Sequence, residues 1–124
     1  MNGKTIKWLY GELRPFLIGI VDNKEIGAFR PGIGAPAAAA MLEELIACGA
    51  KKIFEVGMAG GLQPQLKPGD IIVVTEAIRD EGTSNHYFPP EVKLESSHRL
   101  RNSLLQELTH KRINYSVGSV WTTD

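Results

Sequence analysis

Ile71-Ile72-Val73-Val74-Thr75 is an unbroken run of β-branched and apolar residues near the middle of the chain. Side chains branched at Cβ favour extended backbone. A run without polar alternation is typical of a strand that is covered on both faces. Such strands belong to parallel sheets with helices packed on them. We therefore predict a strand at residues 71–75 that is buried on both faces, in an α/β fold.

The chain before this run predicts a hairpin followed by a helix. Residues 16–21 are mostly apolar and end at Asp22-Asn23, a pair typical of turns, and residues 25–29 follow as a second strand. Residues 30–34 predict a loop, because three of the five are Gly or Pro. Pro36 suits the first turn of a helix, and Gly49 is placed to end that helix.

The remaining elements alternate between strand and helix. We predict a short strand at 53–56, a turn at 67–70, a helix over about 97–111 and a final strand at 115–121. This alternation implies a mainly parallel mixed sheet with flanking helices. We interpret residues 1–124 as a single partial domain. The chain stops at Asp124, directly after a strand, so we expect that the domain is truncated and that further chain follows.

Composition excludes several classes of function. Lys plus Arg and Asp plus Glu number 14 each, so the net charge is zero, and we expect no nucleic-acid partner. The single cysteine, Cys48, cannot form an internal disulfide and is expected to be a small buried residue in a reducing cytoplasm. No apolar run approaches the roughly 20 residues that span a bilayer, and no signal region opens the chain, so we expect no membrane partner.

Residues 32–37 read Gly-Ile-Gly-Ala-Pro-Ala and match the G-x-G-x-x-A form of a dinucleotide fingerprint. Glu55 lies about 20 residues further on, where such folds place an acidic residue for the ribose. The simpler interpretation is that the glycines permit a sharp turn into a helix. The sequence favours this simpler interpretation over a nicotinamide site.

Two further stretches carry candidate binding residues. Residues 55–61 begin at the carboxyl end of the predicted strand at 53–56, and ligands of open α/β sheets collect beyond strand ends. The polar and aromatic loop 79–90 contains His86, which is either a site residue or a solvated loop histidine. The three histidines lack zinc-ligand spacing, so we expect no metal site. The candidate substrate-binding residues are Glu55, Gly57, Met58, Ala59, Gly60, Gly61 and His86; no catalytic residue is assigned.

These stretches, in this order, resemble the nucleoside phosphorylase family. Residues 32–36, 43–46 and 49–53 carry the resemblance, as do 56–61 and 66–70, and loop 79–87 looks like the uridine phosphorylase branch. The resemblance implies a pentosyltransferase that cleaves the glycosidic bond of a purine or pyrimidine nucleoside with phosphate. It further implies a homo-oligomer, nucleoside and phosphate as ligands, and no cofactor besides phosphate as co-substrate.

The chain departs from the family pattern at two positions of the 55–61 motif. Glu55 stands where the family has a phosphate-binding arginine, and Met58 stands where it has Ser or Thr. A carboxylate repels phosphate, and a thioether cannot donate a hydrogen bond. The resemblance implies that the family's ribose-binding and base-binding segments would lie beyond Asp124. We therefore predict an incomplete or inactive phosphorylase-related form.

Three other interpretations remain open. A nucleosidase-like hydrolase uses water instead of phosphate, and its glycine motif is similar to Ala59-Gly60-Gly61. A non-catalytic nucleoside-binding or assembly module would keep the fold without the chemistry. A dinucleotide oxidoreductase is the least favoured.

Overall fold

The computed structural model describes residues 4–6 and 16–123. The chain divides into two compact units, Met1–Lys51 and Lys52–Asp124, and each is described by itself. The single partial domain over residues 1–124 stays a prediction.

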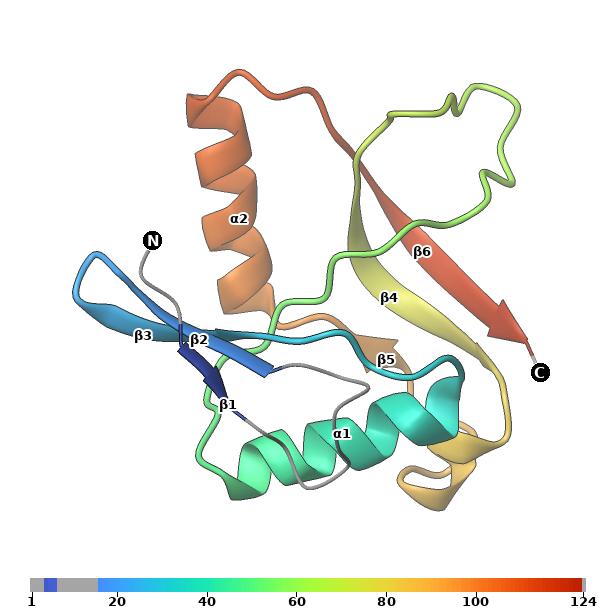
Figure 1. Ribbon diagram of the computed structural model, residues 1–124. Coiled ribbons are helices and arrows are strands. Elements are labelled where there is room, and N and C mark those ends of the chain that lie inside the picture. Colours follow the sequence, from blue (N-terminus) through green and yellow to red (C-terminus); the bar gives the residue numbers. More distant parts are fainter. Residues whose placement is uncertain (1–3, 7–15, 124) are drawn as a thin grey trace. The chain divides into compact units, whose positions relative to one another are not determined.

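The first unit contains a three-stranded antiparallel sheet in the order β1-β2-β3 (Figure 1). Its strands are β1 (Lys4–Ile6), β2 (Phe16–Val21) and β3 (Lys24–Ala28). The turn residues Asp22 and Asn23 have φ angles of 49° and 59°. Two successive positive φ angles are the geometry of a two-residue type I′ hairpin turn, which suits the twist of the flanking strands. The predicted hairpin is confirmed.

The helix of the first unit, α1 (Ala35–Ala47), begins and ends as the sequence predicts. Pro36 occupies its first turn, where the missing N–H has no partner to lose. At the other end Gly49 has φ 98° and donates to the carbonyl of Ile46, while Ala50 donates to Leu45, both at 2.9 Å. These two bonds form a Schellman motif, which satisfies carbonyls that the helix end would leave open.

The prediction that Cys48 is buried is wrong, because the side chain is exposed. Cys48 caps α1, and its backbone N–H bonds to the carbonyl of Glu44 at 2.9 Å. Burial on this helix is confined to Met41 and Leu45, four residues apart on one stripe. Apolar neighbours in the sequence therefore do not show that the Cys48 side chain is buried, because only one face of a helix is covered.

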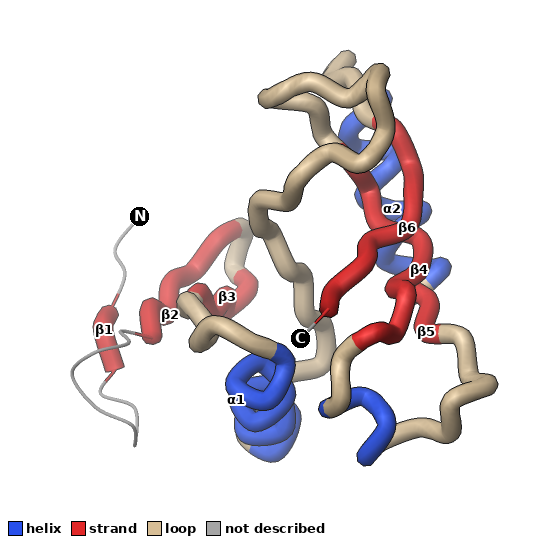
Figure 2. The backbone as a smooth tube through the Cα atoms, turned by 90° about the vertical axis from the view of Figure 1, so that its right-hand side faces the viewer, coloured by secondary structure: helices blue, strands red, loops and turns tan. Residues whose placement is uncertain are grey.

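The second unit is built around β4 (Ile72–Asp80), which lies between two other strands (Figures 1 and 2). It pairs antiparallel with β5 (Leu94–Glu95) and parallel with β6 (Ser116–Thr123). Helix α2 (His98–His110) connects β5 to β6. The side-chain oxygen of Ser97 caps this helix, because it accepts a hydrogen bond from the backbone N–H of Leu100 in the first turn. The predicted α/β class with a mixed sheet is confirmed, and among the described strands parallel pairing occurs between β4 and β6.

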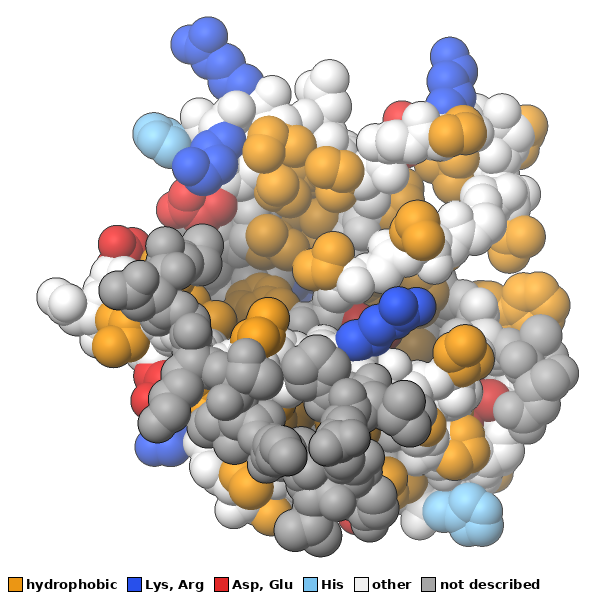
Figure 3. Space-filling view, viewed as in Figure 1, with side chains coloured by type: hydrophobic (Ala, Val, Ile, Leu, Met, Phe, Trp, Pro, Cys, Tyr) orange, Lys and Arg blue, Asp and Glu red, His pale blue; other side chains and the backbone are white. Residues whose placement is uncertain are grey.

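The prediction that the 71–75 run is buried on both faces is wrong. Val73 is buried at 6% exposure, whereas Ile72 and Val74 on the opposite face of β4 are only half-buried. Cover on both faces requires packed elements on both sides of the sheet. In the described part of this unit, the only α-helix is α2. Hydrophobic side chains are visible at many points of the face in Figure 3, and the exposed large ones belong to both units.

The strand predicted at 53–56 is also wrong, because these residues form neither strand nor helix. A strand requires backbone hydrogen bonds to a neighbouring strand, and local composition shows only a preference for extended backbone. The turn predicted at 67–70 is confirmed. Gly69 has φ 98° after Pro68, and the N–H of Asp70 donates to the carbonyl of Lys67 at 3.0 Å.

Both α-helices have 13 residues. In the stretches that the structure describes, no helix has the length and apolar content that crossing a bilayer requires.

Candidate functional site

The carboxyl ends of β4 and β6 meet at one edge of the second unit's sheet. Cα pairing continues to this edge, with Ile78 opposite Trp121 and Asp80 opposite Thr123. Ligands of open α/β sheets bind beyond such ends. The chain leaves β4 here into loop 81–93, which contains the short helix η1 (Thr83–His86) and returns as β5. The loop therefore borders the edge where a ligand is expected.

Arg79 holds this loop with its whole guanidinium group. Nε donates to Oγ of Ser84 at 3.0 Å, and Nη2 donates to Oδ1 of Asn85 and to the carbonyl of Phe88, both at 2.8 Å. Nη1 donates to the carbonyls of Pro89 and Val92. We name these five bonds the Arg79 clamp.

The Arg79 clamp uses the full hydrogen-bonding capacity of the side chain. A guanidinium has five N–H donors, and five different acceptors take them. An arginine near a strand end is otherwise a natural phosphate ligand. In this geometry Arg79 has no donor left for phosphate, so it does not replace the arginine that is absent at Glu55.

Glu81 holds the start of η1. Its Oε1 and Oε2 lie 3.1 and 3.0 Å from the backbone nitrogen of Ser84, which donates to the carboxylate. Hydrogen bonds from Ser84, chiefly from its hydroxyl, lower the pKa of Glu81, against a smaller opposing effect of desolvation. Glu81 is therefore ionised at neutral pH and serves as an acceptor that orders the turn.

Asp80 and Trp121 are joined across the strand ends. The indole N–H of Trp121 donates to Oδ2 of Asp80 at 3.0 Å. A second bond in the same sheet runs from the hydroxyl of Ser119 to Oε1 of Glu76 at 2.8 Å. Both link β4 to β6 through side chains. Trp121 is 47% exposed, so it offers aromatic surface at the candidate ligand edge.

The predicted site residues of the 55–61 motif lie in exposed coil rather than at a strand end. Val56 and Met58 are 97% and 103% exposed. A Cβ added to Gly57 or Gly60 would meet nothing within 4 Å, so open space surrounds the backbone there. Residues 55–61 are all exposed, so a ligand can reach this segment.

His86 ends η1 and is exposed. No hydrogen bond in the described residues joins it to the 55–61 motif. The structure therefore places the two predicted parts of the site in one unit but does not bring them into contact through hydrogen bonds.

A second polar cluster lies around the start of α2 and has a structural explanation. Arg101 Nη1 donates to Oγ of Ser96 at 2.8 Å and to the carbonyl of Thr75 at 3.3 Å. Its Nη2 lies 2.9 Å from Nδ1 of His98, whose Nε2 is 3.2 Å from a carboxylate oxygen of Glu95. A guanidinium donates only, so Nδ1 accepts and Nε2 carries the hydrogen. These contacts attach β5 and α2 to β4.

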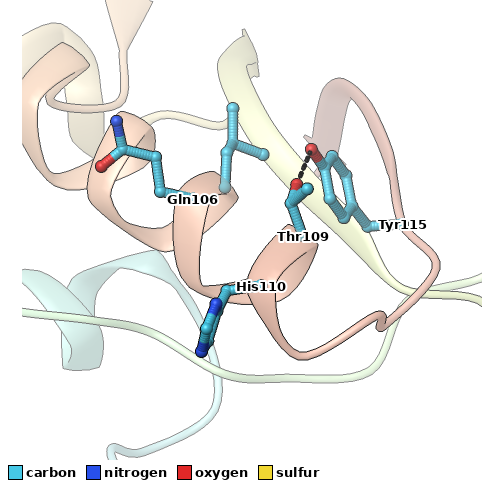
Figure 4. Close-up of a pocket in the computed structure, with 5 residues that line it drawn as sticks. Gln106, Thr109, His110 and Tyr115 are labelled. Carbon is cyan, nitrogen blue, oxygen red and sulfur yellow. Dashed lines mark hydrogen bonds between the residues drawn. The ribbon is translucent and has the colours of Figure 1, made fainter.

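An open pocket lies beside the second half of α2 (Figure 4). It is lined by Leu105, Gln106, Thr109, His110 and Tyr115. Thr109 and Tyr115 point toward one another and are hydrogen-bonded at 3.1 Å, whereas His110 points away. Tyr115 directly precedes β6, so the pocket lies near the amino end of that strand. It is therefore not at the edge where α/β sheets bind ligands.

Over the described ranges 4–6 and 16–123, no group of three or more His, Cys, Asp or Glu side chains is arranged to hold a metal ion.

The sequence predicts that loop 79–90 carries binding residues, and His86 is the one residue of this loop that it assigns to the site. The sequence does contain an indication of the Arg79 clamp, because an arginine at a strand end precedes a loop that contains Ser84 and Asn85 as possible acceptors. Which of those acceptors converge on the guanidinium depends on the path of the loop, and sequence spacing does not specify that path.

Comparison with known proteins identifies the family. Residues 4–124 match the family model of the phosphorylase superfamily. The chain is 32% identical to a uridine phosphorylase of Treponema pallidum (strain Nichols) over 106 residues, which are 86% of this chain and 41% of that relative. It is 34% identical to a uridine phosphorylase of Thermococcus kodakarensis over 93 residues, 75% of this chain and 34% of that relative.

A solved structure gives the same result. The crystal structure of uridine phosphorylase from Vibrio fischeri ES114 superposes with a TM-score of 0.90 at 29% identity, over 99% of this chain and 51% of that one. The chain thus spans from about a third to about half of the length of these relatives. The resemblance to nucleoside phosphorylases that the motifs predicted is confirmed, and the chain belongs to the phosphorylase superfamily.

Proposed function

We propose that the chain binds a nucleoside at the carboxyl edge of β4 and β6 and that, alone, it does not carry out phosphorolysis. Membership of the phosphorylase superfamily carries the first half of this proposal. The relatives named above are uridine phosphorylases, and a further relative, 38% identical over 66 residues, is a guanosine phosphorylase of Halorubrum lacusprofundi. Uridine is the first ligand to test, with guanosine as the purine.

The phosphate half of the proposal rests on Glu55, Met58 and Arg79. Glu55 stands where the family resemblance implies an arginine, and the exposed Met58 offers no donor. All five donors of Arg79 are committed to the loop. Each missing charged hydrogen bond costs about 1.5–3 kcal/mol, so loss of several phosphate contacts should abolish turnover.

Two measurements test the proposal. Titration of the chain with uridine and guanosine, followed by nuclear magnetic resonance (NMR), should show saturable shifts in loop 81–93. Release of uracil or guanine, measured with and without phosphate, should stay at background. Saturation without turnover supports the proposal. Phosphate-dependent release contradicts its second half, and the absence of any shift contradicts its first.

A nucleosidase-like hydrolase is the second candidate. Hydrolysis needs no phosphate, so Glu55 and Met58 would not obstruct it, and Ala59-Gly60-Gly61 fits the resemblance to nucleosidases. Base release that is equal with and without phosphate would favour this candidate.

We also propose that the protein is a cytoplasmic homo-oligomer that needs no cofactor; phosphate would be a co-substrate only in an active form. Exposed apolar side chains in both units support self-association: Ile20 is 68% exposed in the first, and Leu62 is 74% exposed in the second. Light scattering at micromolar concentration should give a mass above that of one chain, and a clean monomer would contradict the proposal.

A further inference from the structure

Loop 81–93 has little regular structure to hold its path. It connects β4 to β5, and η1, with four residues, is its only helix. Within the loop, the N–H groups of Tyr87 and Phe88 donate to the carbonyl of Ser84 at 3.1 and 3.0 Å. These short-range bonds close one turn, but they do not attach that turn to the sheet.

The Arg79 clamp attaches the turn to the sheet. Arg79 lies on β4 and pairs with Thr122 of β6, so its backbone belongs to the two-stranded parallel ladder. Its acceptors extend from Ser84 to Val92 and include three backbone carbonyls. The guanidinium therefore links a rigid strand to most of the loop through a single planar group.

His86 lies between two of the clamped residues. Nη2 of Arg79 binds Asn85 directly before it and Phe88 two residues after it. One nitrogen thus binds the side chain of the residue before His86 and a backbone carbonyl two residues after it. The imidazole itself is free of this network in the described residues and is exposed, so it is available to a ligand.

We infer that Arg79 is a positioning residue, which orders the loop through the clamp and thereby places His86 at the nucleoside edge. This inference rests on the proposed nucleoside site. It assigns Arg79 a role in nucleoside affinity without contact with phosphate or nucleoside. A planar fork is required, because a lysine ammonium has three donors and cannot reach five acceptors spread over the loop.

The first test measures loop order and needs no ligand. Arg79→Lys keeps the charge but removes the fork, and Arg99→Lys makes the same change at an exposed position of α2. We expect hydrogen exchange of the Tyr87 and Phe88 amides to be about tenfold faster in R79K than in the natural chain, with the α2 amides unchanged. R99K should match the natural chain. Equal exchange in R79K and the natural chain overturns the inference.

The second test measures uridine affinity at a temperature where all variants are folded by circular dichroism. We expect R79K to raise the Kd for uridine about tenfold, with R99K unchanged. In Arg79→Ala, millimolar guanidinium chloride should restore affinity, whereas ammonium chloride should not. A merely structural contribution would lower the melting temperature and leave the Kd of the folded variant unaltered.

The outcomes separate this inference from the proposed function. Faster exchange with an unchanged Kd overturns the positioning role and leaves the nucleoside site standing. If the natural chain binds no nucleoside, the proposed function and the role in affinity both fail, while the exchange test still decides whether Arg79 orders the loop. If R79K does not fold, Asn85→Ala removes one acceptor from an exposed side chain, and a smaller change in the same direction is expected.

Discussion

The indole nitrogen of Trp121 lies 3.0 Å from Oδ2 of Asp80, so a side-chain hydrogen bond closes the carboxyl end of the parallel β4–β6 pair. The two residues are 41 positions apart in the chain. The bond therefore fixes the last paired residues of strands that local interactions cannot bring together. It also holds the indole ring of Trp121 at the edge where we propose that a nucleoside binds.

Removal of the Asp80 carboxylate should loosen this end of the sheet. We expect Asp80→Ala to lower the free energy of unfolding by about 0.5–1 kcal/mol, a small value because the bond is exposed. Asp80→Asn keeps a hydrogen-bond acceptor, so its free energy of unfolding should fall by less. Urea unfolding of the two variants checks the difference. If Ala and Asn at this position were equally stable, the bond would contribute nothing measurable.

The order of η1 should depend on pH through Glu81. Hydrogen bonds from Ser84 lower the pKa of Glu81 from its ordinary 4.5 in the folded chain. A lowered folded pKa means that the stabilisation is complete above the unfolded pKa and is lost as pH falls through the folded value. The Ser84 amide shift should therefore change below pH 4.5, measured by NMR. Glu81→Gln should abolish this titration, and a titration that persists in the variant would assign it to another group.

Gly27 and Gly19 make a matched pair in the β2–β3 hairpin. A Cβ on Gly27 would lie 2.5 Å from the ring of Phe16, whereas a Cβ on Gly19 would meet nothing within 4 Å. The Phe16 ring stacks with that of Phe29 at 6.0 Å between centroids, so moving it disturbs a second ring. Gly27→Ala should destabilise by about 0.5–1.5 kcal/mol, because the far end of the Phe16 ring has to turn aside. Gly19→Ala should be neutral or slightly stabilising. Thermal unfolding compares them, and equal melting temperatures would contradict this packing.

The double variant Glu55→Arg with Met58→Thr should acquire affinity for phosphate. Both side chains are exposed, and open space surrounds Gly57 and Gly60 beside them, so the substitutions require no repacking. A guanidinium and a hydroxyl would add donors next to accessible backbone N–H groups. Phosphate should then raise the melting temperature of the variant.

The control for this prediction is Glu107→Arg, which changes the net charge equally at an exposed position of α2. An equal response of that variant to phosphate would show a nonspecific charge effect. If the natural chain binds a nucleotide and the double variant loses that binding, Glu55 is instead a ligand of a ribose hydroxyl, as in dinucleotide folds.

Elements that short-range interactions govern were predictable from the sequence. The turn at Asp22-Asn23 accepts positive φ angles, and Pro36 and Gly49 start and end α1 through local backbone geometry. Helix α2 follows from its N-cap Ser97 and its apolar periodicity. The order and spacing of the glycine motifs likewise indicate the superfamily, which the family model confirms.

Tertiary structure decided the features that require a distant partner. Residues 53–56 have the composition of a strand but no strand neighbour, and Cys48 has apolar neighbours in the sequence but lies on an exposed side. The Arg79 clamp and the Trp121–Asp80 bond are of the same kind, because their acceptors reach the donors only after the loop and the parallel strands are in place. Burial and hydrogen-bond pairing depend on three-dimensional neighbours, whereas turns and helix ends depend on backbone angles a few residues apart.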